Sequence, residues 1–448
     1  MHPSASECLP HQVGALLYLA SHDAESRNAV VARLVLVLSL RNAAAQMKAC
    51  AALAVLAARS GENRKAITAA NAILPLVRAC WASAHYGAST SLSPLSPPIS
   101  TYLPPQVRLL GDGRRTRTDT PQERSAAVLA DLARSGDNKL AIVEAGGVGP
   151  LVAMLVDGSR EAQSAAAGAI WHLAALEPNK KVIYYAGAIV PLVALLSSGS
   201  TDAQTYSAGA LWHLASSADS KAQMAEAGAI PPLVAVLRSP SAEAREHAAA
   251  VLSTLARGQV ANKRAILKAA GLPPLIKLLT DPRVQSQQYA ACALWGLAES
   301  EELNCAREMV EEHVIAPLIE MLQANHPSTR GFAAACLVSL CAQPEAQVGI
   351  KQVGGGEPLV KLARGQPSWL RSRAVEMLEM LGIPVPEPDD TPVTAAKGSP
   401  AGGTVTGANS NSPRMTFHSK TTFHVFSFQA SNSSNWLREV RAQADRGW

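Results

Sequence analysis

The chain has 448 residues, of which 48% are hydrophobic but only 4% aromatic, and its formal net charge is +5. This composition predicts a core of Ala, Leu and Val, which suits closely packed helices. No run of Lys and Arg reaches five residues, which argues against a nucleic acid or a membrane surface as the partner.

The N-terminus and the cysteines indicate the compartment. The first residues, MHPSASECLPHQ, lack the basic and apolar regions of a signal peptide, and His2 excludes the usual N-myristoylation motif. The apolar stretch 29–40 contains Arg33 and is too short to cross a bilayer. The seven cysteines form no CxxC pair and no zinc-type cluster, which is typical of reduced thiols. We expect a soluble cytoplasmic or nuclear protein without stable membrane insertion.

One sequence phrase recurs along the chain. AGGVGPLVAML begins at Ala145, AGAIVPLVALL at Ala186 and AGAIPPLVAVL at Ala227. From the third anchor leucine on, the spacings are 41, 41, 42, 43 and 41 residues, a period within the range of HEAT and armadillo arrays. The anchor leucines are Leu34, Leu76, Leu151, Leu192, Leu233, Leu275, Leu318 and Leu359.

The residues around each anchor predict how one unit folds. A residue that tolerates the left-handed conformation stands five positions before most anchors, and a Pro suited to the first turn of a helix stands directly before nearly all of them. This pattern predicts that each unit contains a short helix, a sharp turn, a second helix and a longer third helix, such as 202–217. The expected turn residues are Asn71, Gly146, Gly187, Gly228, Gly271, His313 and Gly354.

Three helices per unit, with Gly and then Pro at the first bend, resemble the armadillo repeat family over about residues 10–383. The resemblance implies an all-α, right-handed α-solenoid of about eight repeats, preceded by a lone third helix at 9–21. HEAT repeats share the period, but their two-helix unit does not require this bend.

The predicted organisation has four parts. Residues 1–80 hold the half-repeat and the first repeats, and 119–383 hold the main array. Residues 81–118 form an insertion rich in Pro, Ser and Gly, which is either a disordered loop within one repeat or a mistranslated intron. Residues 384–448 form a disordered tail in which only 435–444 favours a helix.

No motif points to catalysis. The chain has no P-loop, no GxGxxG after a strand, no HExxH and no GxSxG, so we expect a non-enzymatic protein without a cofactor. Trp171-His172 and Trp212-His213 recur in successive repeats and suggest either a metal site or solvated histidines on a helix face. We expect the second, because no carboxylate or Cys shares their register.

The third helices carry the candidate binding residues. In armadillo proteins such as the importin-α nuclear import receptors, third helices line a concave groove where a Trp and an Asn one turn later hold an extended peptide. Here Trp171, Trp212 and Trp295 occupy the Trp position and are expected to be partly exposed on that face. The Asn position never carries Asn; three repeats carry Arg there, namely Arg59, Arg134 and Arg257.

The Arg residues change the expected ligand. Guanidinium groups pair with carboxylate and phosphate, which favours acidic or phosphorylated partner segments. Alternatively, the same Arg residues complement the dipoles at helix ends. The predicted function is a scaffold that binds other proteins in its groove. The alternatives are an importin-α-like adaptor, which would need the Asn ladder and a basic N-terminal segment, a ubiquitin-ligase arm, which would need a U-box, and a membrane-tethered protein palmitoylated at Cys8.

Overall fold

The computed structural model describes residue 20 and residues 23–40, 42–81, 120–300, 305–364 and 368–387. All regular secondary structure within these residues is helical. The chain divides into two compact units, Met1–Ala293 and Leu294–Trp448, and the division falls within α18 (Val284–Ala298). Apart from Ala20 and Trp81, the expected half-repeat 9–21 and the insertion 81–118 lie outside the described residues, as does the tail from residue 388.

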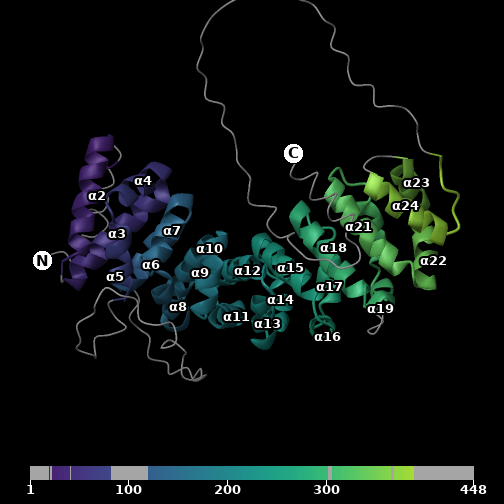
Figure 1. Cartoon of the computed structure of the whole chain (residues 1–448), viewed down its shortest axis with the longest axis horizontal. Helices are drawn as coiled ribbons and strands as arrows, with labels where there is room; N and C mark the ends of the chain where they lie inside the picture. The colour runs from purple at the N-terminus through teal and green to yellow at the C-terminus, as the bar shows by residue number, and fades with distance from the viewer. Residues whose placement is uncertain are drawn as a thin grey trace, which may run out of the picture. The chain divides into compact units, whose positions relative to one another are not determined.

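The first unit repeats the predicted pattern of a first, a second and a longer third helix. Neighbouring third helices α3, α6, α9, α12 and α15 pack on one another in a row (Figure 1). The helices are α2 (Ala24–Leu38), α3 (Ala43–Arg59), α4 (Gly61–Ala69), α5 (Ile73–Trp81), α6 (Pro121–Leu132), α7 (Gly136–Glu144), α8 (Val148–Asp157), α9 (Arg160–Ala174), α10 (Glu177–Tyr185), α11 (Ile189–Ser198), α12 (Thr201–Leu214), α13 (Ala218–Glu226), α14 (Ile230–Val236), α15 (Ala242–Ala256), α16 (Val260–Lys268) and α17 (Leu272–Leu278).

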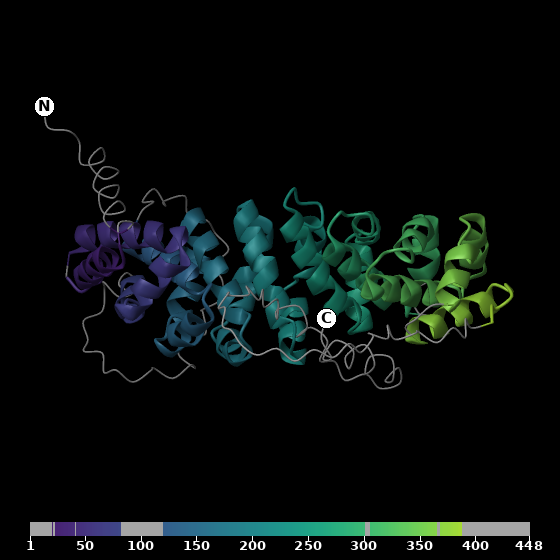
Figure 2. The same cartoon turned by 90° about the horizontal axis from the view of Figure 1, so that it is seen from above.

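The second unit continues the same helix order. From above, its green and yellow helices again follow one another in chain order (Figure 2). They are α19 (Cys305–Glu311), α20 (Ile315–Met321), α21 (Pro327–Leu340), α22 (Pro344–Gln352), α23 (Gly356–Arg364) and α24 (Ser368–Met380).

The anchor leucines form the core of each repeat. Leu34 keeps 9% of its surface exposed and the other seven are fully buried. A Leu side chain buried in this way contributes about 1.5–3 kcal/mol relative to an exposed one. The period read from the sequence is therefore the period of the core.

The bend between first and second helices confirms all but one of the expected turn residues. Helices α7 and α8 meet at 86°, and α10 and α11 at 84°. The backbone takes positive φ at Asn71, Gly146, Gly187, Gly228, His313 and Gly354.

The prediction for the repeat anchored at Leu275 was wrong. There the left-handed residue is Ala270, with φ +54°, whereas Gly271 has an ordinary φ of −77°. Gly271 serves close packing, because a Cβ there would lie 2.7 Å from Cγ2 of Ile266. Ala270 therefore takes a left-handed conformation that is strained for alanine and that glycine adopts freely.

The insertion interrupts the chain but not the packing of its repeat. Helices α5 and α6 lie on either side of it and pack on each other. The Cys80 thiol donates to the backbone carbonyl of Gln122 across 3.8 Å. The second and third helices of this repeat are thus joined in space as in the other repeats.

A ladder of buried asparagines joins successive repeats. The Asn179 side chain donates to the carbonyls of Leu173, at 3.1 Å, and Lys139, at 3.2 Å. Each of the others donates from the first turn of a first helix to a carbonyl at the end of the preceding third helix. We call this set the asparagine ladder: Asn63, Asn138, Asn179 and Asn262.

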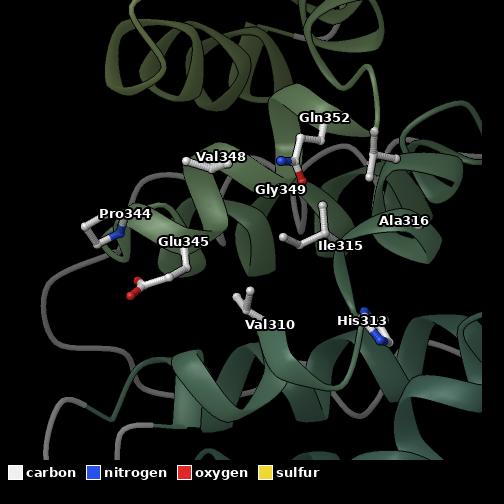
Figure 3. Close-up of a pocket in the computed structure, with 10 residues that line it drawn as sticks. Val310, His313, Ile315, Ala316, Pro344, Glu345, Val348, Gly349 and Gln352 are labelled. Carbon is white, nitrogen blue, oxygen red and sulfur yellow. The ribbon is translucent and has the colours of Figure 1, made fainter.

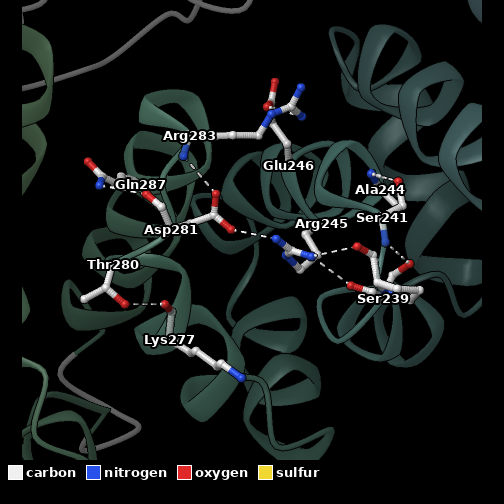
Figure 4. A network of polar contacts seen from close by, with 11 residues as sticks. Ser239, Ser241, Ala244, Arg245, Glu246, Lys277, Thr280, Asp281, Arg283 and Gln287 are labelled. Atoms are coloured by element: carbon white, nitrogen blue, oxygen red, sulfur yellow. Dashed lines mark hydrogen bonds and ion pairs between the residues drawn. The ribbon is translucent and has the colours of Figure 1, made fainter.

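A second repeated contact caps the second helices. Gln204 donates to the carbonyl of Leu196 at 3.0 Å, and the same position in the next repeat is Arg245. Arg245 also forms an ion pair of 2.9 Å with the buried carboxylate of Asp281 (Figure 4). Arg283 pairs with Glu246 beside it at 2.9 Å. These side chains are satisfied within the fold and hold the third helices in register.

Candidate functional site

Five rings from successive third helices form a continuous stack in the first unit. Trp171 stacks on Tyr206 with ring centroids 5.6 Å apart and lies 5.3 Å from His247. Trp212 stacks on His247 at 5.8 Å and meets Tyr289 edge-on at 5.8 Å. Each Trp therefore reaches rings on following repeats. We call these residues the aromatic face.

Glycines make room for this stack. A Cβ on Gly209 would lie 2.6 Å from the indole Nε1 of Trp171 and 3.0 Å from the His247 ring. A Cβ on Gly168 would lie 3.3 Å from the Tyr206 ring. The cost of glycine within a helix is offset here by the ring that lies against the backbone.

The exposure of the three predicted tryptophans differs. Trp171 and Trp212 are half-buried, as predicted, so part of each ring faces solvent. Trp295 is only 6% exposed, so the expectation of a partly exposed ring there was wrong. In its unit, Phe332 stands in the register of Tyr206 and Tyr289 and is itself buried. The rings of this unit pack as core.

The two Trp-His pairs are not solvated as expected. His172 stacks on Trp171 at 4.7 Å and His213 on Trp212 at 4.8 Å, and both imidazoles are half-buried. Burial lowers the pKa of His172 to about 4, helped by the charges of Lys139 and Arg134. Burial and then Lys180 lower the pKa of His213 to about 3. Both are neutral at physiological pH. Within the described residues no group of three His, Cys, Asp or Glu is placed to hold a metal ion.

The three predicted arginines lie at third-helix ends but do not form a continuous row. Arg59 is exposed in the last turn of α3. Arg134 follows α6, lies 3.9 Å from Asp131 and is largely exposed. Arg257 ends α15, with Nη1 3.9 Å from the sulfur of Cys292. Because α9 and α12 separate Arg134 from Arg257, only Arg59 and Arg134 stand on neighbouring repeats.

A hollow of about 660 Å³ lies beside the aromatic face, across α6, α9 and α12. Gly168, Tyr206, His172 and Arg134 are among the residues that line it. Carboxylates, among them Asp131 and Asp202, also line it, so its charge is mixed. The hollow places one predicted arginine next to the aromatic face.

Four lysines on first helices also stand near the candidate site, and the sequence analysis, which considered only third helices, did not predict them. Each follows a member of the asparagine ladder, or Ser220 in its place, at the start of a first helix. First helices begin where third helices end, so these lysines stand at the same end of the repeats as the arginines, although Lys263 is itself buried. The missed signal was an Asn-Lys pair recurring at the repeat period. The lysines are Lys139, Lys180, Lys221 and Lys263.

The second unit has a hollow of a different character. About 500 Å³ in volume, it lies between α20 and α22, with Val348 and Val353 exposed on its rim (Figure 3). Ile315 and Gly349 also line it. None of the predicted binding residues lies there.

Among the residues that the structure describes, no single helix is long and apolar enough to span a membrane, although two bent pairs of helices meet those criteria together.

Comparisons with known proteins agree with the fold. The family model described as armadillo/beta-catenin-like repeat matches residues 137–175, 177–216, 217–257 and 259–299. Among solved structures, an engineered protein is 27% identical with a TM-score of 0.60, covering 85% of this chain and 96% of its own. A computationally designed armadillo repeat protein for modular peptide recognition is 23% identical with a TM-score of 0.48, covering 52% of this chain and 99% of its own. No curated protein matches the chain.

The repeated three-helix units and the row of third helices define an all-α solenoid. The four consecutive family matches cover residues 137–299 of this solenoid. Residues 137–299 of the chain are therefore armadillo repeats.

Proposed function

We propose that this protein is a non-enzymatic scaffold that holds segments of partner proteins along the aromatic face, and that this face belongs to the groove of the solenoid. The observation that carries the proposal is the stack of rings around Trp171 and Trp212, of which both indoles keep an exposed part. Rigid aromatic rings provide large contact area at little cost in conformational entropy. A stack continued over several repeats suits an extended segment.

The composition of the face favours an acidic or phosphorylated segment. Arg59, Arg134 and Arg257 stand where peptide-binding grooves of the importin-α type present Asn. Charged hydrogen bonds to a carboxylate or phosphate contribute about 1.5–3 kcal/mol each. Replacing Arg134 by Gln is therefore expected to weaken an acidic segment by about tenfold and to reduce the salt dependence of its binding.

Fluorescence anisotropy with the full chain tests the proposal. The probes are labelled peptides of alternating Glu and Leu, and of alternating Lys and Leu. We expect the Glu-Leu peptide to bind more tightly, and Trp171→Ala to weaken it. Tyr185→Ala is the matched control, because Tyr185 is an exposed aromatic residue on a first helix. Tighter binding of the Lys-Leu peptide would instead support an import adaptor, and equal effects of the two Ala variants would refute a role for the aromatic face.

A further inference from the structure

Five basic side chains from different helices or helix ends stand beside the aromatic face. Arg134 and His172 line the same hollow, and His172 stacks on Trp171 and His213 on Trp212. The charges of Lys139 and Lys180 both act on His213. Arg134 follows α6, His172 lies on α9 and His213 on α12, whereas Lys139 and Lys180 lie on α7 and α10. The side chain of Asn179 holds the Lys139 backbone at 3.2 Å, and the Lys180 ammonium donates to Ser216 Oγ at 3.2 Å. The Lys180 side chain is thus held beside the end of α12, and the Lys139 backbone is held against α10.

This cluster has more positive than negative charge. Arg134 lies near Asp131, and Lys180 pairs with Glu177 at 2.6 Å. Lys139 is half-buried and forms no ion pair with any residue that the structure describes. Burial lowers its pKa, and its charge in turn acts on both His172 and His213. Burying part of an ammonium group without a neighbouring carboxylate costs desolvation free energy. An anion that binds beside the group would offset this cost.

The cluster also joins the surface already described. His172 stacks on Trp171, and both Arg134 and His172 line the hollow beside the aromatic face. A neutral imidazole still donates one N–H, so the two histidines add neutral donors to the charges of the lysines and Arg134. A chain lying on the rings would have this cluster within reach of its acidic side chains.

We propose that Arg134, Lys139, His172, Lys180 and His213 form an anion-binding cluster that takes the acidic groups of a partner segment lying on the aromatic face. The proposal rests on the proposed function for the identity of the partner, but the cluster is a separate set of residues. Carboxylates and phosphoryl groups on a peptide share the chemistry that it recognises. Of the three arginines predicted from the sequence, only Arg134 belongs to this cluster.

The test measures anisotropy with the full chain and three labelled peptides, in which Leu alternates with Glu, with phosphoserine or with Gln. Lys139→Gln is expected to weaken the Glu-Leu peptide by about tenfold and to leave the Gln-Leu peptide unchanged. Lys139→Arg keeps the charge and is expected to restore most of the affinity. Lys277→Gln is the control, because Lys277 is exposed on the second helix α17. Tighter binding of phosphoserine than of Glu would identify phosphoryl groups as the preferred anion.

The outcomes separate the two proposals. If Lys139→Gln and Lys180→Gln both bind the Glu-Leu peptide like the unmodified chain while Trp171→Ala weakens it, the anion cluster is wrong and the aromatic face stands. If the lysine variants lose affinity but Trp171→Ala does not, the cluster stands and the face is wrong. Failure of all three peptides to bind at physiological ionic strength would overturn both.

Discussion

The asparagine ladder and the aromatic face run along the same repeats but differ in how their polar groups are satisfied. Asn138 and Asn179 are buried, and their amides donate to backbone carbonyls within the fold. On the aromatic face, Trp171 and Trp212 stay half-exposed, and the neighbouring Lys139 has no ion-pair partner among the described residues. A polar side chain whose hydrogen bonds are all made within the fold has a structural role. A partly exposed ring or a charge without an ion-pair partner instead indicates a surface for a ligand.

Residues that are neighbours in the sequence can therefore have different roles, one in the fold and one towards a ligand. Asn138 and Lys139 are adjacent in the sequence and recur together at the repeat period. The first holds repeats together and the second faces the proposed ligand. The amides that import receptors use for peptides therefore have no counterpart in the asparagine ladder, because its amides are occupied by the chain itself.

The largest expected effect comes from breaking the ladder. Asn179→Ala removes the two hydrogen bonds that this amide donates to backbone carbonyls, and we expect it to lower the free energy of unfolding by about 2 kcal/mol. Ser220 holds the equivalent position and donates to no such carbonyl, so Ser220→Ala should cost less than half as much. Urea denaturation measures both. Equal losses would show that the amide contacts do not join the repeats.

The turns that follow the ladder helices sharpen the comparison. Gly228 and Ala270 both take positive φ, at 69° and 54°. We expect Gly228→Ala to lower and Ala270→Gly to raise the free energy of unfolding, each by about 1 kcal/mol, because only glycine adopts this conformation without strain. Thermal denaturation checks the opposite signs. A loss of stability in Ala270→Gly would contradict the assignment of the left-handed turn to Ala270.

The histidines of the aromatic face predict how stability depends on pH. The folded chain keeps His172 and His213 neutral down to pKa values of about 4 and about 3, whereas the unfolded chain protonates them near 6.5. The unfolded state then binds more protons, so stability should fall as the pH drops from about 6.5 towards 4. Denaturation at a series of pH values measures the slope. The double variant His172→Gln, His213→Gln should flatten it; an unchanged slope would place the responsible groups elsewhere.

The smallest effect on stability is expected at the proposed anion cluster. Lys139→Gln removes a half-buried charge that has no ion-pair partner among the described residues, and should change the free energy of unfolding by no more than about 0.5 kcal/mol. The adjacent Asn138→Ala should cost several times more. A large loss in Lys139→Gln would assign this lysine to the structure and not to a ligand.

The sequence predicted those features that depend on a residue's position within the repeat. The anchor leucines, most of the left-handed turns and the half-exposure of Trp171 and Trp212 follow from position in a repeat. The periodicity did not predict the burial of Trp295, because Trp295 holds the same position in its repeat as the half-exposed Trp171 and Trp212. The lysines were missed because only the third helices were considered, although each first helix begins a few residues after a third helix ends. Ala270 was missed because a neighbouring glycine was assigned the turn.

Photo-crosslinking tests most directly the claim that the half-exposed aromatic face, and not a satisfied surface, binds the partner. A Glu-Leu peptide carrying one benzophenone side chain is bound to the full chain, irradiated and mapped by mass spectrometry. The account predicts crosslinks in α9 and α12, near Trp171 and Trp212, and their loss in Trp171→Ala. Crosslinks confined to the second helices α11 and α14, or to the hollow beside Val348, would contradict it.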